Sequence, residues 1–140
     1  MLNAAAGSVG QQPGRETGYQ SGVCNIGPAE IARRRRSAIA ATVVAVIVAI
    51  VILAAGWPSP ARLGLLPFAA AAAVSWLQVT RRFCVGFGAA GVLNFGDLGT
   101  TLSVDDADAR AADRRTARRM ILEGLLYGAL VTIGFWLLPV

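Results

Sequence analysis

Lysine and histidine are both missing from this 140-residue chain, so all thirteen of its positive charges are arginines. The missing histidine removes the commonest general base and the commonest metal ligand of proteins. Ser-His-Asp and Cys-His catalysis are therefore impossible within the chain, and we expect it not to be an enzyme.

Cysteine and charge are also scarce. The two cysteines, Cys24 and Cys84, cannot complete a four-ligand zinc site alone, and their number and spacing do not indicate a disulfide framework. Charged residues make up 15% of the chain, against about 25% in soluble domains, while hydrophobic residues make up 55%. This balance indicates one membrane-embedded domain, and it favours the membrane surface over nucleic acid as the partner of the arginines.

Three long apolar runs hold many of the hydrophobic residues. The run 37–55 carries no charge and is long enough to cross the hydrocarbon core of a bilayer. The run 63–79 is weaker because polar side chains lie within it, and the third run covers 120–138. We therefore predict an all-α membrane protein with three transmembrane helices.

The segments outside these runs differ in character. Residues 1–23 are rich in Gly, Gln, Ser and Ala without any period, which predicts a flexible tail ahead of a transmembrane domain at 24–140. The connection 83–119 has a glycine-rich part and a charged part, and the charged part predicts a helical extension of the third span. Ser103, with Asp106 three residues later, has capping-box spacing at the start of that extension.

The stretch NIGPAEI predicts the start of the first helix. Gly27 takes the N-cap position, and Pro28 falls at the first helical position, where its missing N–H costs nothing. Glu30 falls where its carboxylate faces free backbone amides. Four arginines follow, and the helix then enters the first span.

Arginines mark one side of the membrane. Positive charge near the ends of spans stays on the cytoplasmic side, and Arg62 alone lies on the other side. We predict an N-terminus inside and a C-terminus outside, in a bacterial inner membrane, with the connection 83–119 in the cytoplasm. A twin-arginine export signal is a rival interpretation of the first arginine cluster. The basic face, which we expect to contact anionic headgroups or partner subunits, comprises Arg33, Arg34, Arg35, Arg36, Arg81, Arg82, Arg114, Arg115, Arg118 and Arg119.

Cys24 and Cys84 are the candidates for a thiol or metal site. Cys24 lies just before a positive helix end and four arginines, a setting that favours a reactive thiol. Cys84 follows the second span on the same side, so the two cysteines can meet. Three hypotheses stay open: two unrelated reduced thiols, a redox or disulfide pair, and a shared metal, cluster or cofactor site with a further ligand such as Asp97. No cofactor is predicted outright.

The glycine-rich part of the connection has two interpretations. The pattern G-x-G-x-x-G at 86–91 matches a dinucleotide fingerprint, but a membrane span precedes it instead of a strand, so nucleotide binding is not expected. A re-entrant or interfacial loop is favoured. The sequence NFGDLG then predicts a turn, with Asn94 and Asp97 capping backbone groups around Phe95 and Gly96. In the interfacial loop four large side chains would enter the headgroup zone: Phe83, Phe87, Leu93 and Phe95.

Within the third span, an acid and a glycine pair stand out. Glu123 is a functional candidate because acids inside spans are rare, but Arg119 lies four residues earlier, so a snorkelling ion pair is favoured. Gly124 and Gly128 form G-x-x-x-G, a spacing that permits close helix contact. Hydrogen bonds across helices are expected from two polar residues of the second span, Ser75 and Gln78.

The stretches CNIGPAEIARRRR and RRFCVGFGAAGVLNFGDLG occur here together with a final span. In this combination the chain resembles, over residues 24–140, a group of small uncharacterised three-pass membrane proteins of high-GC bacteria, in particular actinobacteria. The resemblance implies a membrane location and a shared motif that includes both cysteines, and it implies no activity. The residues that carry it are Cys24 to Glu30, Arg82, Cys84 and Asn94 to Gly96.

Together these features favour a non-catalytic function. We expect a small accessory subunit that docks to and stabilises a larger membrane complex, respiratory or otherwise energy-converting, with the basic face contacting other subunits. The first alternative is a cytoplasmic-face thiol or metal-binding protein built on the two cysteines. The second is a homo-oligomeric small transporter with Gln78 or Glu123 in its pore.

Overall fold

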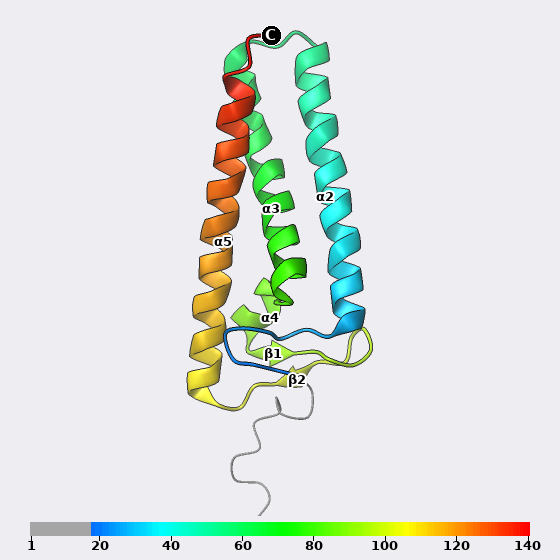
Figure 1. The fold of residues 1–140 in the computed structure, drawn as a ribbon, viewed down its shortest axis with the longest axis vertical. Coiled ribbons are helices and arrows are strands. Elements are labelled where there is room, and N and C mark those ends of the chain that lie inside the picture. The colour runs from blue at the N-terminus through cyan, green and yellow to red at the C-terminus, as the bar shows by residue number, and fades with distance from the viewer. Residues whose placement is uncertain (1–17) are drawn as a thin grey trace, which may run out of the picture.

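The structure, a computed structural model, describes residues 18–140. It is mostly helical, and three of its helical segments are long and apolar enough to cross a membrane (Figure 1). These segments run along the long axis of the molecule, and the short elements between the second and third segments gather at one end. In chain order the elements are α2 (Pro28–Ala54), η1 (Ser59–Leu65), α3 (Leu66–Arg81), α4 (Val85–Ala90), β1 (Val92–Leu93), β2 (Leu102–Ser103) and α5 (Ala107–Trp136).

The first helix begins where the sequence predicts. Gly27 is the N-cap of α2, and Pro28 is its first residue. The helix then runs without a break through the arginine cluster and the first apolar run. It ends at Ala54, two residues before Gly56, whose φ of 64° is a left-handed conformation that stops helices.

The third long helix also contains the predicted extension, since α5 is continuous from Ala107 to Trp136. Its cap differs from the prediction. Asp106 is the N-cap and accepts a hydrogen bond from the Asp108 amide at 3.0 Å, whereas Ser103 lies in β2. Ser103 cannot cap α5 because it pairs with Val92 in the strand ladder, and the helix begins four residues later, at Ala107.

Helix α3 is the middle member of an open layer. It packs against α2 on one side and α5 on the other, whereas α2 and α5 make no extensive contact with each other (Figure 1). Between α2 and α3, the Trp76 indole donates a hydrogen bond to the Thr42 hydroxyl at 2.9 Å. Between α3 and α5, the contact is made by glycine: a Cβ atom on Gly128 would lie 2.6 Å from the backbone nitrogen of Ala70. Small residues therefore bring these backbones together.

The same contacts set the register of the three helices. Thr42 lies opposite Trp76, and Gly124 lies against Val74. An α-helix rises about 1.5 Å per residue, so the distance of each arginine from these contacts along its helix can be estimated. By this estimate the arginines at the three helix ends lie at about the same height along the long axis of the molecule. The level lies at the boundary between the apolar runs and the end of the molecule that holds the short elements.

We call that end the cap, and it consists of residues 18–27 and 82–106. Its strands β1 and β2 pair antiparallel, with Val92 opposite Ser103. The segment before α2 joins them, because the Gly27 amide donates to the Asn94 carbonyl at 2.8 Å. Two small cores hold the cap to α5. One contains Tyr19, Leu93, Val104 and Ala109, and the other contains Phe83, Ala117 and Met120.

The cap corrects two predictions. Phe83 and Leu93 are completely buried in these cores, so the prediction that they enter the headgroup zone is wrong for both. The reason is α4, a short helix that packs on α5 and folds the glycine-rich connection back on the protein. Of the predicted tail, residues 1–17 lie outside the described residues, whereas Tyr19 packs in the cap with 5% of its surface exposed.

Candidate functional site

A buried polar network joins the cap to the start of α2. Asn25, which is fully buried, brackets Cys84: its side-chain oxygen accepts from the Cys84 amide at 2.7 Å, and its nitrogen donates to the Cys84 carbonyl at 3.1 Å. The Cys84 sulfur then accepts hydrogen bonds from Arg34 at 2.9 Å and from the Phe87 amide at 3.5 Å. Cys84 is therefore the N-cap of α4 and an acceptor for a guanidinium group.

The network continues on the other side of Arg34. Glu30 is 1% exposed and lies 3.9 Å from Arg34 and 3.7 Å from Arg33. It accepts a hydrogen bond from the side-chain nitrogen of Asn94 at 3.3 Å. Asn94 also closes the predicted turn, because its oxygen accepts from the Gly96 amide at 2.9 Å. Asn25, Cys84, Arg34, Glu30 and Asn94 thus form one chain of contacts, which we call the polar network.

A second buried acid holds the segment before Cys24. Asp113, on α5, is fully buried and accepts hydrogen bonds from the Tyr19 hydroxyl at 2.8 Å and from the Gly22 amide at 2.6 Å. Thr116, one turn later, donates to the Gly22 carbonyl at 2.7 Å. Burial raises the pKa of Tyr19 above its usual value, and the hydrogen bond to Asp113 and the negative charge of Asp113 raise it further.

The two cysteines lie on neighbouring segments but have separate partners. Cys24 donates weakly to the Ile26 carbonyl at 3.8 Å, whereas Cys84 faces Arg34, and both thiols are free. Asp97 is exposed, and only its backbone carbonyl joins the network, through Asn94. Within residues 18–140, no group of three or more cysteine or acidic side chains is arranged to hold a metal ion.

The structure gives the polar residues of the spans partners that differ from the predicted ones. Glu123 pairs with Arg81 of α3, whereas Arg119 is exposed. Ser75 donates within its own helix, to the Ala71 carbonyl. Gln78 accepts from the Val85 amide at 3.1 Å and so supports the start of α4. The hydrogen bond that crosses between α2 and α3 joins Trp76 and Thr42 instead.

The glycine pair of α5 packs inside the molecule. Gly124 and Gly128 are both buried against α3, so the close contact that G-x-x-x-G permits is used within the chain. The glycines of the connection have local roles as well: a Cβ atom on Gly88 would lie 2.6 Å from the ring of Phe83, and Gly91 has a φ of 72°. Two of the three glycines in the dinucleotide-like pattern, Gly88 and Gly91, thus have a structural reason in the packing of this segment.

An arginine belt surrounds the molecule at the boundary of cap and spans. Its members are exposed, in contrast to Arg34, whose guanidinium is turned into the polar network. The acidic side chains near this boundary are not exposed and free: Glu30 and Asp113 are buried, and Glu123 is paired with Arg81. The exposed acids Asp97, Asp105, Asp106 and Asp108 lie farther from the spans, in the cap and the first turn of α5. The arginine belt consists of Arg33, Arg35, Arg36, Arg82, Arg114, Arg115, Arg118 and Arg119.

Sequence reasoning missed several residues of these sites. Asn25, Arg34 in its buried role, Tyr19 and Asp113 were not singled out. Asn25 stands beside a flagged cysteine and immediately before a helix start, which was the available signal. Asp113 offered none, because it lies among exposed charges on an extension that the sequence describes only as helix-forming.

Three helical segments that are long and apolar enough to cross a membrane, joined to a folded cap, are consistent with a multi-pass membrane protein. Comparison of the chain with known protein families, with characterised proteins and with solved structures gives no match in any of the three.

Proposed function

We propose that this protein is a small accessory subunit that docks to a larger membrane protein complex and stabilises it. The arginine belt carries the proposal. It presents guanidinium groups from the start of α2, the end of α3 and the extension of α5, and the polar network and the two small cores hold these segments in one folded unit.

The belt is suited to binding because most of its arginines have no acidic partner. Arg33 has Glu30 at 3.7 Å, whereas among residues 18–140 none of the other belt arginines has a carboxylate within ion-pairing distance. Guanidinium groups form bidentate hydrogen bonds with carboxylates and are favoured at interfaces. The ligand that we propose for the belt is an acidic surface on the partner complex, next to the membrane.

The same residues support a proposal for the side of the membrane on which the cap lies. Arginines near span ends favour the cytoplasmic side, and the three helices place theirs at one end. We propose that the cap is cytoplasmic, with the N-terminal flank of α2 inside and the end of α5 outside. Protease cleavage at the exposed turn around Asp97, in sealed vesicles of known orientation, tests this arrangement directly.

The docking proposal is tested by gentle solubilisation, affinity purification and mass spectrometry of the chains that co-purify. The variant Arg118→Gln/Arg119→Gln should lose most of the partner chains, because it removes two exposed charges from the belt. The matched control is Thr101→Glu/Ser103→Glu, which changes net charge by the same amount at exposed cap positions outside the belt. The control should keep its partners.

Two results would overturn the proposal. One is a wild-type protein that purifies alone under conditions that preserve other membrane complexes. The other is a belt variant that retains its partners as fully as the control does. Raising the salt concentration gives an independent check, because binding through exposed charges weakens as the Debye length shortens.

A further inference from the structure

We propose that one anionic phospholipid binds along the α2–α3 seam, with its phosphate between Arg35 and Arg82 and one acyl chain in an apolar groove alongside. The proposal does not depend on the accessory role, and it concerns two belt arginines that the docking test leaves unchanged.

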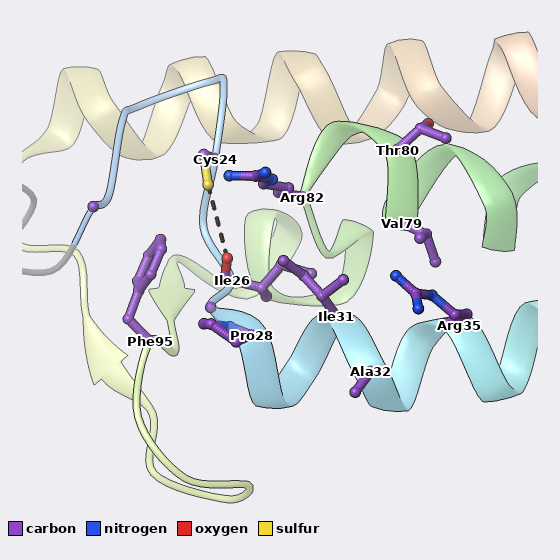
Figure 2. A pocket seen from close by; sticks show the side chains of 12 residues that line it. Cys24, Ile26, Pro28, Ile31, Ala32, Arg35, Val79, Thr80, Arg82 and Phe95 are labelled. Carbon is purple, nitrogen blue, oxygen red and sulfur yellow. Dashed lines mark hydrogen bonds between the residues drawn. The ribbon is translucent and has the colours of Figure 1, made fainter.

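The phosphate end is a pocket of about 700 Å³ between the cap and the starts of the spans (Figure 2). Arg82 lies beside Cys24, and Arg35 extends from α2 toward Val79 on α3. None of the lining residues is acidic. Among residues 18–140, no carboxylate lies within ion-pairing distance of either arginine, whereas Arg33, Arg34 and Arg81 each have one.

The backbone at Arg82 strengthens this assignment. Arg82 has a φ of 51° and is the one non-glycine residue of the described chain in the left-handed region. That conformation is unfavourable for an ordinary L-residue, and helix ends of this kind usually take glycine. The arginine side chain at this position enters the pocket, where glycine would leave Arg35 as the only cation.

The acyl-chain end is a groove of about 450 Å³ whose lining is almost entirely apolar. Alanines of α2 and α3, such as Ala49 and Ala73, form its floor, and Val131 of α5 lies on its far side. It exists because α2 and α5 do not close over α3. Three of its lining side chains carry a polar group. The Trp76 indole and the Thr42 hydroxyl are hydrogen-bonded to each other, and the third group is the Tyr127 hydroxyl.

The pocket and the groove lie on one line. One face of α2 carries Arg35, Thr42 and Ala49, because these residues are spaced by seven. Arg35 lines the pocket, and Thr42 and Ala49 line the groove. From Arg35 to Ala49 the helix rises about 21 Å. This length matches a headgroup followed by one leaflet, since half of a hydrocarbon core of about 30 Å is about 15 Å.

Cys24 supplies a reporter for the phosphate end, because it lines the pocket and is partly exposed, whereas Cys84 is 1% exposed. The protein is placed in maltoside micelles, and alkylation of Cys24 by neutral iodoacetamide is followed by mass spectrometry. Added phosphatidylglycerol should slow the reaction several-fold. Inorganic phosphate alone should not, because it lacks the chain that occupies the groove.

Variants separate the site from general charge effects. Arg35→Gln/Arg82→Gln should abolish the protection and lower retention of phosphatidylglycerol in native mass spectrometry by about tenfold or more, as expected for the loss of charge-assisted hydrogen bonds. Arg36→Gln/Arg115→Gln removes the same charge outside the pocket and should keep the protection. A reporter moved to the exposed position 21 (Cys24→Ser/Ser21→Cys) should not be protected.

The groove has its own pair of variants. Ala73→Phe fills it and should reduce lipid retention, whereas Ala40→Phe adds the same ring on an exposed part of α2 outside the groove and should not. Three outcomes overturn the proposal: no protection by phosphatidylglycerol, equal protection by inorganic phosphate, or equal loss in both arginine variants. Loss of partner chains without loss of lipid, or the reverse, distinguishes this site from the docking surface.

Discussion

The cap and the spans of this protein are held together by different interactions. In the cap, buried polar side chains hold segments together through hydrogen bonds. Asn25 bonds both backbone groups of Cys84, and Asp113 accepts hydrogen bonds from Tyr19 and Gly22. In the spans, α3 and α5 meet through two glycines, Gly124 against Val74 and Gly128 against Ala70.

The difference follows from the surroundings of each region. A cap beside water gains from hiding apolar groups, so it can form small cores and must satisfy the polar groups that it buries. Helices in lipid gain nothing from hiding apolar surface, so close packing of small residues has to hold them together. Replacing a buried polar residue of the cap should therefore unfold the cap and leave the spans packed. Replacing a glycine between α3 and α5 should loosen the spans and leave the cap folded.

The largest effect should come from Asn25→Ala. The change leaves the buried amide and carbonyl of Cys84 without partners, at a cost of about 1–3 kcal/mol for each group. Hydrogen exchange should accelerate at residues 82–94 and remain slow in the α3–α5 interface. Gln20→Ala, at an exposed cap position, is the control. Equal acceleration in both regions would show that cap and spans unfold as one unit.

The matching change in the spans is Gly128→Ala. A Cβ atom would lie 2.6 Å from the Ala70 nitrogen, so the helices must move apart, at a cost of about 1–3 kcal/mol. Gly134→Ala is the matched control, because a Cβ atom there meets nothing within 4 Å. Unfolding by SDS titration should show the loss for Gly128→Ala alone. A neutral result would mean that the glycine contact is looser than described.

A smaller, pH-dependent effect should come from Tyr19. Its folded-state pKa is raised, so its contribution to stability is complete below about pH 10, the usual tyrosine value, and falls as the pH rises above it. The chain has no lysine, so no lysine titration obscures this range. Tyr19→Phe should cost about 1 kcal/mol at neutral pH through the lost hydrogen bond to Asp113.

Limited proteolysis of the segment around Gly22 checks this prediction. Cleavage of the wild type should accelerate above about pH 10, whereas cleavage of Tyr19→Phe should start faster and change less with pH. If both proteins show the same pH dependence, the Tyr19–Asp113 contact does not hold this segment in place.

Sequence reasoning succeeded where local chemistry decides the structure. Pro28 after Gly27 specified a helix start, and long apolar runs specified three long helices. It failed where partners come from distant segments. The sequence around Cys84 does not indicate that its partners are Asn25 and Arg34. Helical spacing predicted Arg119 as the partner of Glu123, but it could not show that Arg81 of another helix lies nearer. The cap was therefore the less predictable region, because its bonds join residues far apart in the chain.

The smallest expected effect concerns the pair between Arg81 and Glu123, at the boundary of the two regions. Both side chains are about one-third exposed, and ion pairs of this kind contribute about 0–1 kcal/mol. Glu123→Gln and Arg81→Gln should each lower stability slightly, and a double-mutant cycle should give a coupling of a few tenths of a kcal/mol or more. The same cycle between Glu123 and Arg119 should give none. Coupling to Arg119 alone would show that the acid turns along its own helix, and that α3 and α5 are joined at this level by packing without an ion pair.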